Sequence, residues 1–481
     1  MLIRKGETWI SAGRFLTLVA GIVSIRIITE IVSPQEYGRL SLVMGLISFF
    51  SLILYTSLGR SATRYIWDYI NQDKGAVWVW NVIFATFGLG FIFTILLWSA
   101  LAFGIDIKLD PLVAIWTIPV FLIAGSLATI LLGIFNILQE HRIFVLGMVI
   151  NAWLKPGLAI FFALLFLPTA EMILVGYASS ALLLMLGVLW AANKRSLLQF
   201  VPHKLAIIPT LTKMGIYTIP FIFVNLFYWT QITSNRFILD ANLGIEQVGV
   251  FVVAATVGRL PIQSLESIFG QVHQPRLYKK IGQQSDKAVD VQIRRLAFSE
   301  YILSFLIITL PILGLTIITG DILIRLFAAE SYWIGVKVIP WIATAEFLRA
   351  LTAVFSIAFE IEKRPRSLVF PIVIGSLVTL GLTYFLSLKF GIVGAGIALT
   401  VGTLVWLLFI SIPASQLSCW SIPWPELLKA TFSSVIIGTI IHLTRVFTSN
   451  LGFPVEIISL GVVFIIVYLL YSGKRLLDIR E

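Results

Sequence analysis

Long apolar segments alternate with short polar ones along the whole chain, and this pattern predicts a bundle of membrane-spanning helices. About 20 predominantly apolar residues form an α-helix long enough to cross the lipid core. The predicted spans are 8–32, 41–58, 77–103, 112–136, 144–166, 171–192, 214–238, 245–268, 296–318, 338–360, 367–388, 393–417, 430–447 and 454–471. Because backbone groups inside lipid must bond within their own element, fourteen such segments predict an all-α polytopic membrane protein.

Composition excludes the soluble classes of protein. Of 481 residues, 58% are hydrophobic and 12% are charged, and the mean hydropathy is +0.97. A soluble domain carries about 25% charged residues, so a soluble enzyme, a nucleic-acid-binding domain and a disordered chain are all excluded. The only cysteine, Cys419, excludes an internal disulfide, and the four histidines lie far apart in the sequence. We therefore expect no metal site and no cofactor.

The distribution of lysine and arginine predicts the orientation in the membrane. Loops on the side of the N-terminus carry 23 basic residues, Arg60 and Arg64 among them, whereas the opposite loops carry five. Those five are Arg39, Lys108, Arg325, Lys337 and Lys389. Basic residues collect in cytoplasmic loops, and an even number of spans returns the chain to its starting side. Both termini are therefore predicted to be cytoplasmic.

A weak internal repeat divides the chain. The segment Ser24-Ile-Arg26-Ile-Ile28-Thr-Glu30 matches Ser234-Asn-Arg236-Phe-Ile238-Leu-Asp240 at an offset of 210 residues. After one added residue, Glu36-Tyr37-Gly38 matches Gln247-Val248-Gly249. An offset of six spans gives both copies the same direction through the membrane, as in transporters built from parallel repeats. We predict a six-helix bundle at 1–195, a second at 196–418, and two additional helices with a cytoplasmic tail at 419–481.

Seven basic residues fall inside the predicted spans, where a charge needs a partner or a water-filled cavity. They are Arg14, Arg26, Lys155, Arg236, Arg259, Arg349 and Arg445. Helical spacing pairs Arg26 with Glu30, Arg349 with Glu346, and Arg259 with Glu266. The alternative for each basic residue is a structural ion pair, or a long side chain that reaches the interface. For Arg445, near the end of a span, we expect this structural role.

Basic residues outnumber the nearby acids, and this excess predicts a cavity for an anionic substrate. The planar fork of arginine suits phosphate in particular. The predicted substrate-binding residues are Arg14, Arg26, Lys155, Arg236, Arg259 and Arg349. The predicted ion-coupling or charge-pairing residues are Glu30, Asp240, Glu266 and Glu346.

At these residues the chain resembles the Wzx-type polysaccharide flippases, within the superfamily that also holds multidrug/toxin extruders and lipid II flippases. The resemblance covers essentially the whole chain. It is carried by Ser33-Pro34-Gln-Glu36-Tyr37-Gly38, by Ser234-Asn-Arg236-Phe-Ile238-Leu239 with Val248-Gly249-Val-Phe, by Gly391-Ile-Val-Gly394-Ala395, and by Trp424-Pro-Glu-Leu-Leu-Lys429. One position departs from the family: an acid often precedes the arginine of the seventh span, and Asn235 stands there in this chain.

The resemblance implies a non-enzymatic flippase in a bacterial or archaeal cytoplasmic membrane. Such a protein moves a polyprenyl-diphosphate-linked oligosaccharide from the inner to the outer leaflet by alternating access of two bundles around a cationic cavity, often with an ion gradient. O-antigen assembly and a polysaccharide polymerase partner belong to the same expectation, and no nucleic acid does.

Three other functions stay open. A lipid II flippase has the same plan, and a multidrug/toxin extruder needs a more acidic or aromatic cavity. A membrane glycosyltransferase or ligase needs a cluster of catalytic groups on the outer side. The acids there, Asp106, Asp110, Glu171 and Glu330, are sparse in the sequence and are not expected to assemble such a cluster.

Overall fold

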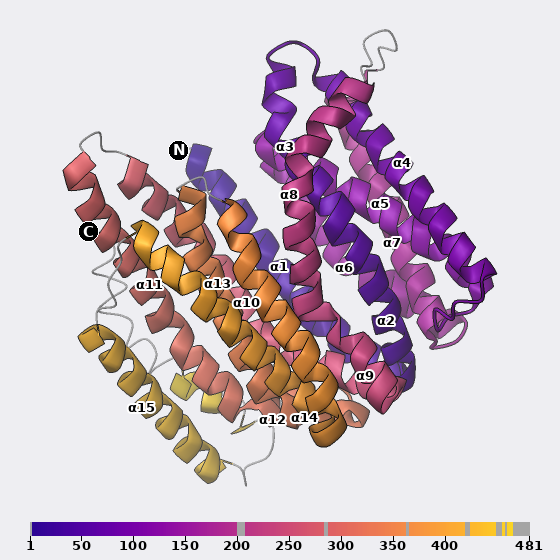
Figure 1. Cartoon of the computed structure of the whole chain (residues 1–481). Coiled ribbons are helices and arrows are strands. Elements are labelled where there is room, and N and C mark those ends of the chain that lie inside the picture. Colours follow the sequence, from indigo (N-terminus) through magenta and orange to yellow (C-terminus); the bar gives the residue numbers. More distant parts are fainter. Residues whose placement is uncertain are drawn as a thin grey trace. The chain divides into compact units, whose positions relative to one another are not determined.

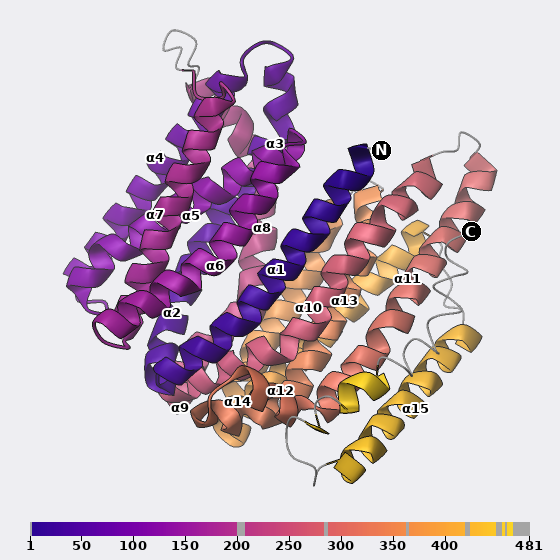
Figure 2. The same cartoon turned by 180° about the vertical axis from the view of Figure 1, so that it is seen from behind.

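Helices are the only regular elements among the residues that the computed structural model describes (Figure 1, and from behind in Figure 2). The described residues are 2–199, 207–282, 287–361, 365–418, 424–448, 455–456 and 459–464. Within them, ten helices are long and apolar enough to cross a membrane. The all-helical, multi-pass membrane architecture is thus confirmed. The number of fourteen spans and the repeat stay predictions, and most of the predicted span 454–471 lies outside the described residues.

The chain divides into two compact units. Unit 1 contains Met1–Gly249 and Phe327–Ser331, and unit 2 contains Val250–Leu326 and Tyr332–Glu481. The helices of the predicted seventh span therefore belong to unit 1 by their packing, although the proposed repeat assigns them to the second bundle. Packing and sequence ancestry are different properties, so the boundary at 195/196 stays a prediction.

Unit 1 is built from antiparallel and crossing helices with short turns between them. Its elements are α1 (Leu2–Ile31), α2 (Pro34–Phe50), η1 (Ser51–Thr56), α3 (Ser57–Ile70), α4 (Gly75–Ala102), α5 (Pro111–Ile137), α6 (His141–Leu165), α7 (Ala170–Lys194), α8 (Ile207–Thr233), α9 (Asn235–Leu243) and the first turn of α10 (Ile245–Gly282). Side-chain caps set several helix starts: Ser33 caps α2, Asp110 caps α5 and Thr169 caps α7. Proline follows two of these caps at the first helical position, where its missing N–H costs nothing.

The core of unit 1 lies between α3, α4, α5 and α7. Trp78 of α4 is fully buried there, and its indole N–H donates to the carbonyl of Ala62 on α3 at 3.0 Å. An unsatisfied indole N–H would penalise this burial, so the bond allows a large side chain to fill the centre of the bundle. A second apolar cluster joins α1, α2, α5 and α7 around Ile118 and Leu174.

The second predicted span, 41–58, is too short. The helix runs from Pro34 to Ile70 without a break, because η1 is a π-helical segment that continues α2 into α3. A π-helical insertion accommodates an extra residue without ending the helix, and such insertions are frequent at functional sites. As a result Arg60 and Arg64, which were predicted to lie in a loop, lie on α3.

Unit 2 contains most of α10 and the helices that follow. They are α11 (Lys287–Ile318), α12 (Gly320–Phe327), η3 (Glu330–Val338), α13 (Ile339–Ile361), η4 (Pro365–Leu368), α14 (Val369–Ser418) and α15 (Trp424–Thr448), of which Phe327 and the first two residues of η3 belong to unit 1. Its main core joins α10, α11, α13 and α14 around Phe305 and Ala350.

Glycines shape two junctions that the span pattern predicts only approximately. The predicted span 214–238 is divided at Ser234 into α8 and α9, and Gly244, with φ of +87°, ends α9. Gly391, with φ of +60°, breaks α14 between the predicted spans 367–388 and 393–417. Both φ values lie in the region that glycine alone adopts without strain.

Candidate functional site

A cavity of about 420 Å³ lies within unit 1, between α2, η1, α3, α5, α6 and α7. Hydroxyl and amide side chains provide much of its polar wall: Ser51, Thr56, Thr63, Ser126, Thr129 and Asn151. The side chain of Lys155 and that of Arg60 also line it, and none of the described residues that line it carries a carboxylate. A cavity of this size falls in the range of small-ligand sites.

Lys155 of α6 is the predicted substrate-binding residue that reaches this cavity. Its ammonium lies 4.3 Å from the ring centre of Tyr177 on α7 and 5.0 Å from that of Phe121 on α5. Among the described residues, the Lys155 ammonium contacts these two rings and has no carboxylate or hydrogen-bond partner. A cation–π contact attracts a cation but does not neutralise it, so the positive charge remains available to an anion.

Arg60 is a cavity residue that sequence analysis missed. Its guanidinium carbon lies 4.6 Å from the ring centre of Phe221 on α8, and no described carboxylate pairs with it. The error came from ending the second span at residue 58. The apolar helical pattern that continues through Tyr65 and Ile66 was the signal that could have placed Arg60 on a span.

The four predicted residues of unit 2 meet in one cluster. Arg349 of α13 donates to Glu346 at 2.6 Å and contacts Glu266 of α10, and Arg259 of α10 lies 3.8 Å from Glu346. The pair Arg349–Glu346 was predicted, whereas Glu266, which was predicted to pair with Arg259 on its own helix, contacts Arg349 of α13. Glu346 is 3% exposed. Two arginines and two glutamates leave the cluster close to neutral, unlike the cavity in unit 1.

The remaining predicted residues lie apart from the cavity wall, all in unit 1. Arg26 pairs with Glu30 as predicted and donates to the carbonyl of Ala328 at 2.6 Å. Arg236, on α9 with Asp240, donates to the carbonyl of Ser41 at 3.0 Å. Arg14 lies half-buried on α1. None of the three arginines is among the residues that line the described cavity.

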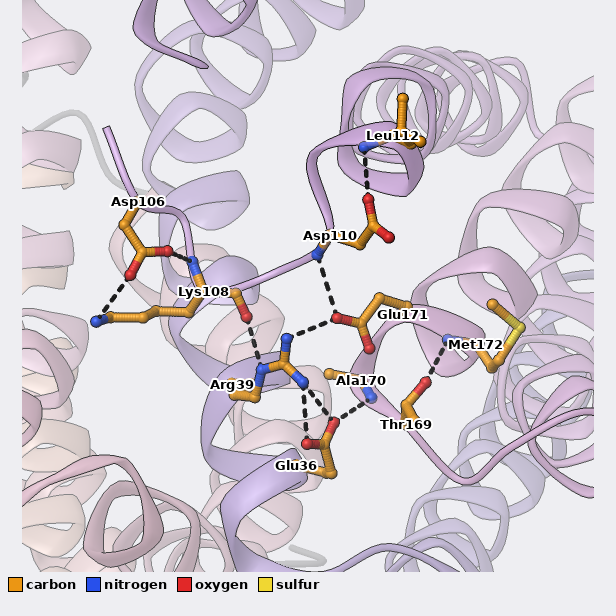
Figure 3. Close-up of polar contacts among 10 residues, drawn as sticks. All are labelled: Glu36, Arg39, Asp106, Lys108, Asp110, Leu112, Thr169, Ala170, Glu171 and Met172. Carbon is orange, nitrogen blue, oxygen red and sulfur yellow. Dashed lines mark hydrogen bonds and ion pairs between the residues drawn. The ribbon is translucent and has the colours of Figure 1, made fainter. Parts of the chain in front are cut away.

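Arg39 and the carboxylates of Glu36 and Glu171 form a network with backbone groups at the first turn of α2 (Figure 3). The guanidinium of Arg39 donates to Glu36 at 3.0 Å, to Glu171 of α7 at 2.7 Å and to the carbonyl of Lys108 at 2.7 Å. Glu36 also accepts from the N–H of Ala170 at 2.8 Å, and Glu171 accepts from the N–H of Asp110 at 3.3 Å. We refer to Glu36, Arg39, Asp110, Ala170 and Glu171 as the Arg39 network.

The Arg39 network bears on the acids of the predicted outer side. The backbone N–H of Asp110 meets the carboxylate of Glu171, whereas Asp106 bonds to Lys108 (Figure 3). Their carboxylates are bonded to backbone N–H groups and basic side chains. The amide and ammonium of Lys108 lower the pKa of the Asp106 carboxyl, so it is ionised at neutral pH. These bonds hold the loop before α5 to the first turns of α2 and α7, so the acids have a structural role.

Comparison with known proteins agrees with the fold. The chain is similar in structure to a lipid II flippase, MurJ, in an inward closed conformation, with a TM-score of 0.71, 14% identity and 99% coverage of both chains. It is also similar to a multidrug resistance MATE family transporter of the MOP superfamily. The inward-facing form gives a TM-score of 0.60 at 16% identity and covers 84% of this chain and 95% of that one. The outward-facing form gives 0.61 at 15% identity, with 86% and 96% covered.

These identities are low, so the structural likeness shows the fold alone. A search of curated protein sequences gives no match. The family whose description is "polysaccharide biosynthesis protein" matches residues 3–280, more than half of the chain. This match confirms the predicted resemblance: the chain belongs to the polysaccharide biosynthesis protein family, and its fold is similar to that of the lipid II flippase and the MATE family transporter.

Proposed function

We propose that this protein moves a polyprenyl-diphosphate-linked oligosaccharide from the inner to the outer leaflet of a prokaryotic cytoplasmic membrane. The two units alternate access to the substrate, and both termini are cytoplasmic. The family match and the transporter fold support a flippase of polysaccharide biosynthesis. The likeness to a lipid II flippase supports a lipid-linked substrate.

The observation that carries the proposal is the uncompensated positive charge of the unit 1 cavity. Among the residues that the structure describes, Lys155 and Arg60 face it with only aromatic contacts, and no carboxylate lines it. A diphosphate that leaves water loses its hydration, and fixed cations offset part of that cost. The hydroxyl and amide groups between them suit the hydroxyls of a sugar. An organic cation, the substrate class of an extruder, would be repelled there.

The predicted arginines take different parts in this proposal. Arg259 and Arg349 are neutralised by Glu266 and Glu346, so we propose that this cluster couples the cycle to an ion through its carboxylates. Arg14, Arg26 and Arg236 stay proposed substrate contacts during passage. Lys155 and Arg60 are the proposed diphosphate contacts.

The test is a flipping assay in proteoliposomes with a fluorescent polyprenyl-diphosphate oligosaccharide. We expect Lys155→Met and Arg60→Gln each to lower the rate by about tenfold or more, because a hydrogen bond to a charged group contributes roughly 1.5–3 kcal/mol. Lys194→Met is the matched control, since Lys194 also lies on an aromatic ring, 3.8 Å from the ring centre of Trp190, but does not line the cavity. Its rate should stay within about twofold of wild type.

Wild-type rates in both cavity variants, at equal protein content, would refute the assignment. Uptake of an organic cation without lipid flipping would favour the extruder.

A further inference from the structure

Within unit 1, α2 and the first turn of α10 cross with their backbones in direct contact at Gly38 and Gly249. A methyl group at Gly38 of α2 would overlap the carbonyl oxygen of Ile245 and lie 3.2 Å from the amide nitrogen of Gly249. A methyl group at Gly249 of α10 would overlap the carbonyl oxygen of Pro34 and lie 3.0 Å from the amide nitrogen of Gly38. Only glycine permits this approach.

The contact is reciprocal. Each glycine lies against the carbonyl four residues before the other glycine. Under the proposed repeat, Gly38 corresponds to Gly249, and Pro34 corresponds to Ile245. When the first copy contacts the second exactly as the second contacts the first, a local two-fold axis runs through the contact. Within unit 1, the first turns of α2 and α10 are therefore related by local two-fold symmetry at the Gly38–Gly249 crossing.

On one side of the crossing, α2 is held rigidly. Glu36 and Arg39 flank Gly38 in the same turn of α2, and the Arg39 network bonds them to the first residues of α7 and to the loop before α5 (Figure 3). A turn with this many bonds to two other segments has little freedom to move within unit 1.

On the other side, the chain passes from unit 1 to unit 2. Unit 1 ends at Gly249, and Val250 begins unit 2 within the same helix. The chain returns to unit 1 only at Phe327–Ser331, where Arg26 donates to the carbonyl of Ala328, and the N–H of Ala329 donates to the hydroxyl of Thr29 at 3.1 Å. The segments of unit 1 that adjoin unit 2 in the chain are thus held by α1 and α2: the first turn of α10 contacts α2, and residues 327–331 bond to α1.

We propose that the Gly38–Gly249 crossing is the pivot of the transport cycle. The first turn of α10 stays on α2 while the rest of α10 moves with unit 2. Points on a rotation axis are displaced least, so a contact with no side chains between the backbones persists through the rotation. This proposal rests on the proposed function, because a pivot requires a cycle.

Cross-linking tests whether the first turn of α10 stays on α2 during the transport cycle. A covalent tether between the two turns is tolerated only if their separation does not change. Gln35 and Glu246 are exposed, and each lies three residues before the glycine of its helix. In a Cys419→Ser background, Gln35→Cys and Glu246→Cys are joined by a short bifunctional thiol reagent. The joined protein should flip lipid-linked oligosaccharide within about twofold of the unjoined variant. A loss of about tenfold or more on joining would overturn the pivot.

Spin-label distances separate failure of the pivot from failure of the proposed function. If wild type flips no lipid-linked oligosaccharide, labels at the same two cysteines still decide the question, beside a second pair at Gln72 in unit 1 and Arg295 in unit 2. We expect the distance between the labels at 35 and 246 to have a single value at every pH and salt condition. The distance between the labels at 72 and 295 should show several populations. A 35–246 distance that changes together with 72–295 overturns the pivot, and so does a single 72–295 distance.

Substitution of the glycines gives an independent check. Gly38→Ala and Gly249→Ala should each lower flipping by about tenfold or more, because the added methyl forces the two backbones apart. Gly88→Ala and Gly381→Ala are the controls, since a methyl group at either position meets no atom within 4 Å. Glycine variants that flip at the rate of these controls would contradict the close crossing.

Discussion

Basic side chains in this protein are stabilised in two distinct ways. Arg349 and Arg259 are neutralised by glutamates inside unit 2, whereas Lys155 and Arg60 lie on aromatic rings at a cavity wall of unit 1. The first arrangement satisfies the charge locally, and the second leaves the charge without a carboxylate partner among the described residues. Which arrangement a basic residue has cannot be read from its position along a span.

The cluster around Glu346 predicts a difference in stability between two glutamates. Glu346 is 3% exposed and contacts two arginines, so Glu346→Gln should lower the free energy of unfolding by roughly 3–5 kcal/mol. Glu30 is 49% exposed in its pair with Arg26, so Glu30→Gln should cost no more than about 1 kcal/mol. Unfolding in a detergent series measures both. Equal losses in the two variants would show that Glu346 does not neutralise the arginines.

At the scale of elements, helix ends and interruptions determine where polar groups meet. The π-helical η1 carries the helix past Thr56 and places Arg60 on the cavity wall. The turn at Gly244 sets the start of α10, and this places Gly249, the fifth residue of α10, against Gly38 of α2. Farther along, Arg445 of α15 donates to the carbonyl of Ile318 at 2.9 Å and pairs with Asp321 and with Glu456 at 3.3 Å.

This bonding predicts that Arg445 holds α15 against α11 and α12. Arg445→Met should increase hydrogen exchange in α15 by about tenfold or more, because it removes a charged hydrogen bond contribution of roughly 1.5–3 kcal/mol. Exchange in α5 and α7 should not change. Arg445→Lys, which retains the charge but loses the forked geometry, should fall between. Unchanged exchange in α15 of the methionine variant would show that apolar packing around Ile437 and Ile441 suffices.

For the whole molecule, the asymmetry of basic residues predicts opposite sides for two turns. Gln72 lies in the exposed turn before α4, and Ile105, which is 58% exposed, lies in the turn after it. In a Cys419→Ser background, Gln72→Cys should react with a membrane-impermeant thiol reagent only after the membrane is opened. Ile105→Cys should react in intact cells. The reverse pattern, or reaction of both from outside, would contradict cytoplasmic termini.

The sequence by itself determined the class of protein and the positions of most helices. A segment of apolar residues long enough to cross the membrane is a local property, because lipid requires each helix to satisfy its own backbone. The pairs Arg26–Glu30 and Arg349–Glu346 were equally local, since residues three or four apart share a helix face. Family membership followed from short motifs in order along the chain, and the comparison confirmed it.

Only the tertiary structure decided which charges on separate helices meet. Glu266 and Arg349 are 83 residues apart, and Arg39 and Glu171 are 132 apart, so no spacing rule could pair them. Arg60 reached the cavity because a π-helical segment continued its helix, and its neighbour Phe221 comes from α8. The Gly38–Gly249 contact likewise joins helices that are remote in sequence. Helix formation depends on local backbone bonding, but the partner of a buried charge depends on how separate helices pack, and one sequence read in order does not contain that packing.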